Sequence, residues 1–183
     1  MRIIGGALRG RRLAAPGGSA TRPTADRVRQ ALFDSLSHAP WAGSEAISGA
    51  SVLDAFAGTG ALGLEALSRG AMDAVFFETD AAARRILSAN IAACQMQDCT
   101  RIIAADAQHP PPGRPCTLVF LDPPYDDPTL LAKALSALTS AGWIAPAALL
   151  VVESAARNPV PAFGGLIAER HYGVARIGFF RKP

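Results

Sequence analysis

From residue 51 to residue 153 the chain alternates short apolar runs with amphipathic stretches, and this alternation limits the possible folds more than any other feature. Apolar runs at 51–54, 74–78, 101–105, 117–122 and 148–153 predict strands, and the stretches at 61–68, 81–93 and 128–141 predict helices. Strand–helix–strand units connect in one hand and place helices on both faces of a parallel sheet. Runs at 166–172 and 174–180, joined at Gly173, predict an antiparallel terminal hairpin and complete a seven-stranded α/β sheet.

Size and composition favour one main domain with a substantial core. The chain has 183 residues, and half of them are apolar. Its three cysteines are odd in number and lack Cys-x-x-Cys spacing, so we expect neither a disulfide framework nor a metal cluster. No run reaches about 18 uninterrupted apolar residues, and the first residues lack an apolar leader. We expect a cytoplasmic monomer with no membrane or metal partner.

Basic residues are concentrated at the start of the chain. Residues 1–30 carry seven arginines and one acid, a charge of +6, which leaves −3 for the remainder of a chain whose net charge is +3. Mixed runs around a glycine-rich middle predict a small basic β-hairpin extension at 1–20, followed by a catalytic domain at 21–183. Arginines clustered in this way favour contacts with nucleic-acid phosphates. The predicted RNA-binding residues are Arg2, Arg9, Arg11, Arg12 and Arg22.

A glycine-rich turn joins the first sheet strand to its helix. Gly58, Gly60 and Gly63 form Gly-x-Gly-x-x-Gly, which lets a ligand approach a helix N-terminus. A nicotinamide dinucleotide site fits the same expression. However, residues 54–57 separate the strand from the first glycine and introduce Asp54, whose carboxylate disfavours an anionic diphosphate. S-adenosylmethionine, with a sulfonium and an ammonium group, suits that acid better.

Further acids follow the next two strands on the side where ligands bind in such sheets. Glu78 is placed to accept both ribose hydroxyls, and Asp106 to accept from the adenine amino group. The alternative for each is a helix cap or a solvated strand end, and for Asp54 it is a purely structural turn residue. The predicted S-adenosylmethionine site comprises Asp54, Ala55, Phe56, Gly58, Thr59, Gly60, Glu78 and Asp106.

The tetrapeptide Asp122-Pro123-Pro124-Tyr125 follows the buried run 117–121 and predicts the catalytic site. An exocyclic amine is a poor nucleophile, because its lone pair is delocalised into the base. A carboxylate from Asp122 and the carbonyl of Pro123 can accept its two N–H bonds and direct the lone pair at an electrophilic methyl group. The prolines fix the backbone and donate no hydrogen bond. Tyr125 is suited to stack on the base, so the motif predicts amine methylation.

The chain resembles class I S-adenosylmethionine-dependent methyltransferases, which have a Rossmann-like fold. Segments 1–13, 22–24, 27–29 with 32–33, and 60–71 are similar to bacterial 16S ribosomal RNA guanine-N2 methyltransferases. The resemblance implies methyl transfer to one guanine of 16S ribosomal RNA in a small-subunit particle. It implies that Gly58, Gly60 and Glu78 bind the cofactor and that residues 122–125 bind the target amine. Tyr125 stands where that family often has phenylalanine.

The residues alone leave other functions open. Asp-Pro-Pro-Tyr also occurs in adenine-N6 DNA methyltransferases, although this chain has no spare segment large enough to read a DNA sequence. Guanine offers two adjacent hydrogen-bond donors to a carboxylate, which favours guanine over adenine as the target base. A nicotinamide-dependent oxidoreductase and a non-catalytic RNA-binding factor are further alternatives. Asp54 disfavours the first, and the second leaves the tetrapeptide unexplained.

Overall fold

A computed structural model describes residues 1–15, 23–42, 45–124, 127, 129–158 and 165–182, and the side chains of 23–25 are left out of the description. Predicted site residues Arg22 and Tyr125 lie outside the described residues. Among the helices described, none is long and apolar enough to cross a membrane.

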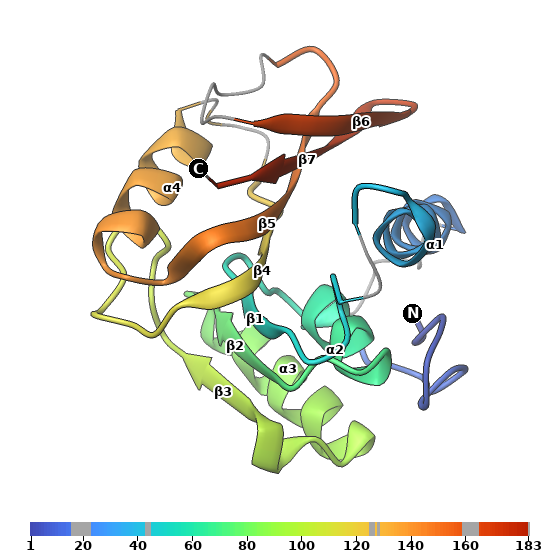
Figure 1. Cartoon of the computed structure of the whole chain (residues 1–183). Coiled ribbons are helices and arrows are strands. Elements are labelled where there is room, and N and C mark those ends of the chain that lie inside the picture. The colour runs from blue at the N-terminus through green and yellow to red at the C-terminus, as the bar shows by residue number, and fades with distance from the viewer. Residues whose placement is uncertain (16–22, 43–44, 125–126, 128, 159–164, 183) are drawn as a thin grey trace.

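One mixed sheet organises the molecule (Figure 1). Its strands are β1 (Ser51–Asp54), β2 (Asp73–Phe77), β3 (Thr100–Ile103), β4 (Cys116–Leu121), β5 (Ile144–Ala155), β6 (Leu166–Tyr172) and β7 (Ala175–Arg181). The spatial order is β3-β2-β1-β4-β5-β7-β6. Strands β1 to β5 run parallel, and β7 pairs antiparallel with both β5 and β6. The predicted sheet and its antiparallel end are confirmed.

Helices cover both faces of the sheet, as predicted. Figure 1 shows α1 (Pro23–His38), α2 (Ala61–Ser68) and α3 (Ala81–Cys94) on one face and α4 (Leu130–Ser140) on the other; a short 3₁₀ helix, η1 (Gln97–Cys99), precedes β3. Successive strand residues enter opposite cores because side chains alternate along a strand. Phe120 packs against Phe33 of α1, and the preceding Val119 belongs to the core under α4.

Strand β5 begins at Ile144, four residues before the predicted start. Its pairing with β4 is irregular, because the register shifts between Cys116 and Leu118. Ala147 also has a positive φ of 57°. The sequence pattern around Ala147 does not show the alternation of a regular strand, so the prediction missed the part of β5 that precedes this irregularity.

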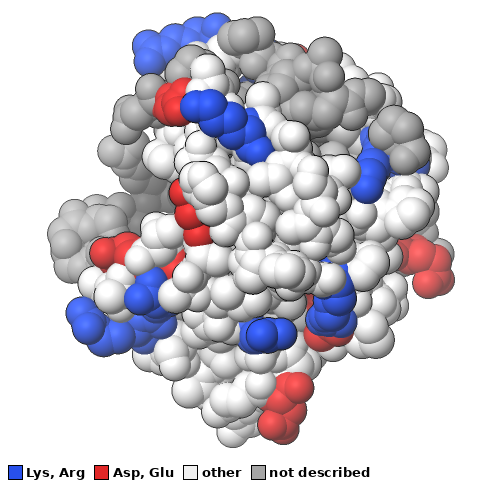
Figure 2. Space-filling view, turned by 90° about the vertical axis from the view of Figure 1, so that its left-hand side faces the viewer, with Lys and Arg blue, Asp and Glu red and all other residues white. Residues whose placement is uncertain are grey.

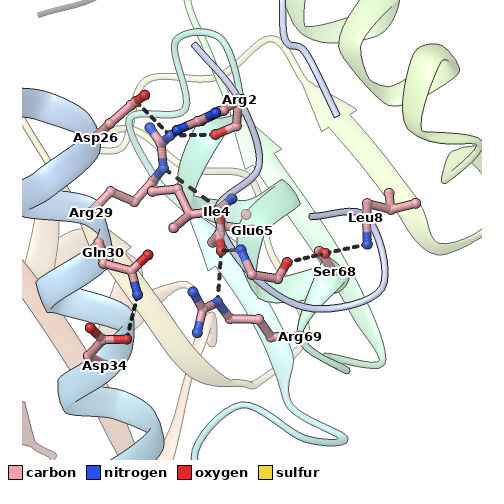
Figure 3. A network of polar contacts seen from close by, with 12 residues as sticks. Arg2, Ile4, Leu8, Asp26, Arg29, Gln30, Asp34, Glu65, Ser68 and Arg69 are labelled. Atoms are coloured by element: carbon pink, nitrogen blue, oxygen red, sulfur yellow. Dashed lines mark hydrogen bonds and ion pairs between the residues drawn. The ribbon is translucent and has the colours of Figure 1, made fainter. Parts of the chain in front are cut away.

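Residues 1–15 form an arm that lies against α2 and α3. The predicted hairpin is reduced to one antiparallel bridge, between Arg2 and Arg12. Instead of a longer ladder, the arm gives backbone N–H groups to helix side chains: those of Ile4 and Gly5 reach the carboxylate of Glu65 (Figure 3). A Cβ atom at Gly6 would lie 1.8 Å from the Ser68 carbonyl oxygen, so a glycine is needed for this close approach.

Candidate active site

A pocket of about 390 Å³ lies at the carboxyl ends of the central strands. The chain places β2 and β3 on one side of β1 and β4 on the other, so the direction in which strands are added reverses between β1 and β4, although the two strands run parallel. Ligands of open α/β sheets bind in the crevice outside such a reversal. The pocket is lined by Ala55, Phe56, Gly58, Phe77, Glu78, Thr79, Ala105, Asp106, Ala107, Gln108, Asp122, Pro124 and Leu130.

The structure brings most of the predicted site residues together in this pocket. Five of the eight cofactor residues line it, and so do two of the four catalytic residues; they are Ala55, Phe56, Gly58, Glu78, Asp106, Asp122 and Pro124. Asp54, Thr59 and Gly60 are not among the lining residues. Pro123 is buried beside the pocket.

Backbone contacts fix the shape of the glycine loop. The Gly58 N–H donates to Glu78 Oε2 at 2.8 Å, and the other oxygen of this carboxylate accepts from the Asp80 N–H at 2.7 Å. Gly60 has a φ of 82°, and a Cβ atom there would lie 2.3 Å from Leu87 Cδ1. A side chain at position 60 would therefore be strained and would collide with α3.

Asp54 lies beneath the loop, whereas the sequence predicted a position beside the ligand. It is 1% exposed, and its Oδ2 accepts from the Gly63 N–H at 3.1 Å. Its Oδ1 has no hydrogen-bond partner among the described residues. Burial raises the pKa of Asp54 to about 7 against the opposing effect of the Gly63 N–H, and the negative charge of Glu78 adds to the rise. The carboxyl group shapes the first turn of α2.

Asp122 faces the pocket directly after β4 and is only partly exposed. Burial raises its pKa well above the usual range, and the charges of Glu153 and Asp54 raise it further. The pairing of β4 with β5 explains the influence of Glu153, because Leu121 pairs with Val152 and each acid follows one of these two residues. Acids gathered at the carboxyl ends of neighbouring strands thus favour the binding of a cation nearby.

Asp106 has local partners in the loop after β3. Its Oδ1 accepts from the Gln108 N–H at 2.8 Å, and His109 Nδ1 lies 3.5 Å from Oδ2. Within the described part of the segment between β3 and β4 there is no helix for it to cap. Asp106 therefore stabilises a turn and also lines the pocket.

These residues fit S-adenosylmethionine. Burial first, and then the charges of nearby acids, raise the pKa values of Asp54 and Asp122, and a sulfonium and an ammonium group would favour the ionised form of both carboxyl groups. Glu78 has a carboxylate at the pocket wall suited to ribose hydroxyls, and Phe56 and Phe77 provide apolar walls. No group of three or more His, Cys, Asp or Glu residues able to hold a metal occurs among the residues described.

The predicted RNA-binding arginines of the arm are exposed and border two surface hollows. Arg2 and Arg9 line a hollow of about 460 Å³ together with Arg27 of α1, and Arg9 also lines a hollow of about 600 Å³ with Arg11 and Arg12. The opposite side of the molecule looks different. Figure 2 shows basic side chains there that are interspersed with acidic ones and separated by large uncharged areas.

Comparisons with known proteins agree with this geometry. The model of the family described as "Conserved hypothetical protein 95" matches residues 1–181. Ribosomal RNA small subunit methyltransferase D of Escherichia coli K12 is 42% identical over 163 residues, which cover 88% of this chain and 78% of that protein. The chain belongs to this family of methyltransferases. The putative rRNA methyltransferase YlbH of Bacillus subtilis is 30% identical and matches 100% of this chain and 99% of its own length.

Solved structures support the same assignment. The putative methyltransferase yhhF of Escherichia coli aligns with a TM-score of 0.83 and 39% identity, covering 100% of this chain and 97% of its own. The putative methylase HI0767 of Haemophilus influenzae gives 0.79 and 31%, covering 100% and 98%. S-adenosylmethionine is the methyl donor of methyltransferases of this class, and the residues that line the pocket fit it.

The sequence did not identify the residues that join the arm to the domain. Glu65 is fully buried and accepts from Arg69 Nε at 2.8 Å, and Arg29 Nε lies 4.0 Å from it (Figure 3). Ser68 donates to the Gly5 carbonyl at 2.6 Å and accepts from the Leu8 N–H at 3.0 Å. The available signal was a charged residue inside the otherwise apolar helix 61–68, since such a residue is rarely buried without partners.

Proposed function

We propose that this protein transfers a methyl group from S-adenosylmethionine to the exocyclic N2 amine of a guanine in 16S ribosomal RNA. The position of Asp122 carries the proposal, because its carboxyl group lines the pocket one residue beyond β4. Relatives named for small-subunit ribosomal RNA support this substrate, and the exposed arginines of the arm suit its phosphates.

The bound cofactor supplies an electrophilic methyl group. Asp122 accepts one N–H of the guanine amine, and the carbonyl of Pro123 accepts the other. Both contacts favour the pyramidal amine, whose lone pair is then directed out of the base plane. As positive charge develops on nitrogen, the carboxylate stabilises it, accepts the released proton and passes it to water.

Asp122 must be ionised for this role, although the free protein raises its pKa. Burial, and then the charges of Glu153 and Asp54, raise that pKa, and the positive charge of the bound cofactor opposes the effect of those two charges. Cofactor binding therefore favours the carboxylate form of Asp122 at the moment it is needed. In the same scheme Tyr125 stacks on the extruded base.

The arm contributes affinity and orientation. Arg2, Arg9, Arg11 and Arg12, with Arg22 beyond the described arm, contact phosphates, while the folded surface of a small-subunit particle provides specificity by shape. A monomer is sufficient for this arrangement. The substrate implies a cytoplasmic location.

Methyl transfer to three nucleic acids tests the proposal. The protein is incubated with labelled S-adenosylmethionine and unmethylated small-subunit particles, free 16S ribosomal RNA or duplex DNA. We expect label in small-subunit RNA, in particles or in the free molecule, and none in DNA. Label in DNA would support the adenine-N6 DNA methyltransferase alternative and reject the RNA assignment.

A further inference from the structure

One buried amide joins the cofactor loop to the end of the arm. Asn90 is a residue of α3 and is 2% exposed. Its Nδ2 donates to the Thr59 carbonyl at 2.9 Å and to the Ala14 carbonyl at 3.1 Å, while its Oδ1 accepts from the Ala14 N–H at 2.7 Å. Both N–H bonds and the oxygen of the side chain are used, so an alanine at this position leaves backbone groups of Thr59 and Ala14 without this partner.

Thr59 lies between two glycines whose positions matter for the cofactor pocket. The preceding Gly58 lines the pocket and donates to Glu78, and the following Gly60 begins the turn into α2. The Asn90 contact to Thr59 therefore holds the loop at the residue next to Gly58, which contacts Glu78. Both contacts depend on α3, because Asp80, which donates to Glu78, caps its first turn.

Ala14 lies at the other end of the link, near the end of the described arm. Two of its backbone groups bind Asn90, as a neighbouring strand would bind them. The arm carries Arg11 and Arg12 immediately before this point, and both are exposed. Ordering of the basic arm can therefore be transmitted to the glycine loop through the side chain of Asn90.

The other anchors of the arm do not make this link. Glu65 and Ser68 hold Ile4, Gly5 and Leu8, which belong to the first half of the arm. Their hydrogen bonds lie at the second half of α2, away from the loop that precedes it. The chain thus offers a matched pair of contacts, one that joins the arm to the cofactor loop and one that joins it only to the domain.

We propose that Asn90 is a positioning residue that couples the arm to the cofactor loop, so that RNA on the arm and cofactor in the pocket strengthen each other's binding. The inference rests on the proposed function, which assigns RNA to the arm. Whichever ligand binds first orders the Thr59–Asn90–Ala14 unit, and the second ligand then binds an ordered site. Because coupling free energies are reciprocal, both affinities rise by the same factor.

The test measures the dissociation constant of S-adenosylhomocysteine by calorimetry, with and without saturating unmethylated 16S ribosomal RNA. In the wild type we expect RNA to tighten binding by roughly fivefold or more, the lower end of common coupling factors. In Asn90→Ala we expect the two constants to agree within about twofold. The control Ser68→Ala removes arm contacts without touching Thr59, and we expect it to keep the wild-type coupling.

A second measurement does not depend on any variant. Hydrogen exchange of the wild type is followed in peptides that cover residues 55–65, and we expect slower exchange when RNA alone is added. Unchanged exchange, a wild-type coupling factor near one, or full coupling in Asn90→Ala would overturn the inference. These outcomes differ from failure of the proposed function, in which the wild type neither binds ribosomal RNA nor methylates it.

Discussion

Two glutamates, Glu78 at the pocket and Glu65 beneath the arm, use the same chemistry for different purposes. Each accepts two backbone N–H groups, Glu78 from the glycine loop and the start of α3, Glu65 from Ile4 and Gly5. Glu78 remains partly exposed at a cavity wall, whereas Glu65 is fully buried and contacts Arg69 and Arg29. The comparison shows that charge balance and exposure, not hydrogen bonding, distinguish Glu78, which we propose binds the cofactor, from the structural Glu65.

The largest expected effect concerns stability at the structural acid. Glu65→Ala leaves Arg69 and the N–H groups of Ile4 and Gly5 without their acceptor. We expect the free energy of unfolding to fall by about 3–5 kcal/mol, as is usual when one partner of a buried charge pair is removed. Urea unfolding followed by circular dichroism measures the change. A loss below about 1 kcal/mol would show that the buried network does not anchor the arm.

Substitution of the catalytic acid is expected to affect the reaction and to spare the fold. For Asp122→Ala we expect single-turnover methyl transfer to fall by roughly 10²–10³-fold, the usual cost of losing one electrostatic contact in the transition state. S-adenosylmethionine binding, measured by calorimetry, is expected to change by only a few-fold. Robust turnover in this variant would remove the chemical basis of the proposal.

Substitution of Glu78, the proposed cofactor-binding acid, is expected to weaken S-adenosylmethionine binding far more than it weakens the fold. Glu78→Gln retains an acceptor but loses the charge-assisted contacts to the loop and to the ribose hydroxyls. We expect S-adenosylmethionine affinity to fall by roughly tenfold, since hydrogen bonds to charged groups contribute about 1.5–3 kcal/mol each and part of this remains. The urea midpoint is expected to move far less than in Glu65→Ala. Equal losses of stability at Glu78 and Glu65 would contradict the comparison.

A change of pH is expected to produce the most gradual effect. The pKa of Asp54 is raised by burial to about 7, so between pH 4 and pH 7 the unfolded chain releases a proton that the native protein retains. The wild type therefore loses stability relative to Asp54→Asn as pH rises through this range, by at most about 1.4 kcal/mol per pH unit. Unfolding of both proteins at pH 4.5, 6 and 8 measures the difference, and a constant difference would show that Asp54 is already ionised.

Sheet topology was predictable because each strand and helix has its own local signal. Helix α2 occupies the predicted range 61–68, and the acids after β2, β3 and β4 line the pocket, since parallel strands end at one edge. The position of Asp54 was not predictable, because the first turn of α2 folds back over it. Asn90 gave no signal either, since its partners lie 31 and 76 residues away and only the tertiary fold brings them together.

The most direct test of the account identifies the methylated nucleoside. Unmethylated small-subunit RNA is treated with the wild-type protein and labelled S-adenosylmethionine, digested to nucleosides and separated by chromatography with mass detection. The account predicts label in N2-methylguanosine alone, and none after treatment with Asp122→Ala. Label in N6-methyladenosine or in a ring-nitrogen product would contradict it.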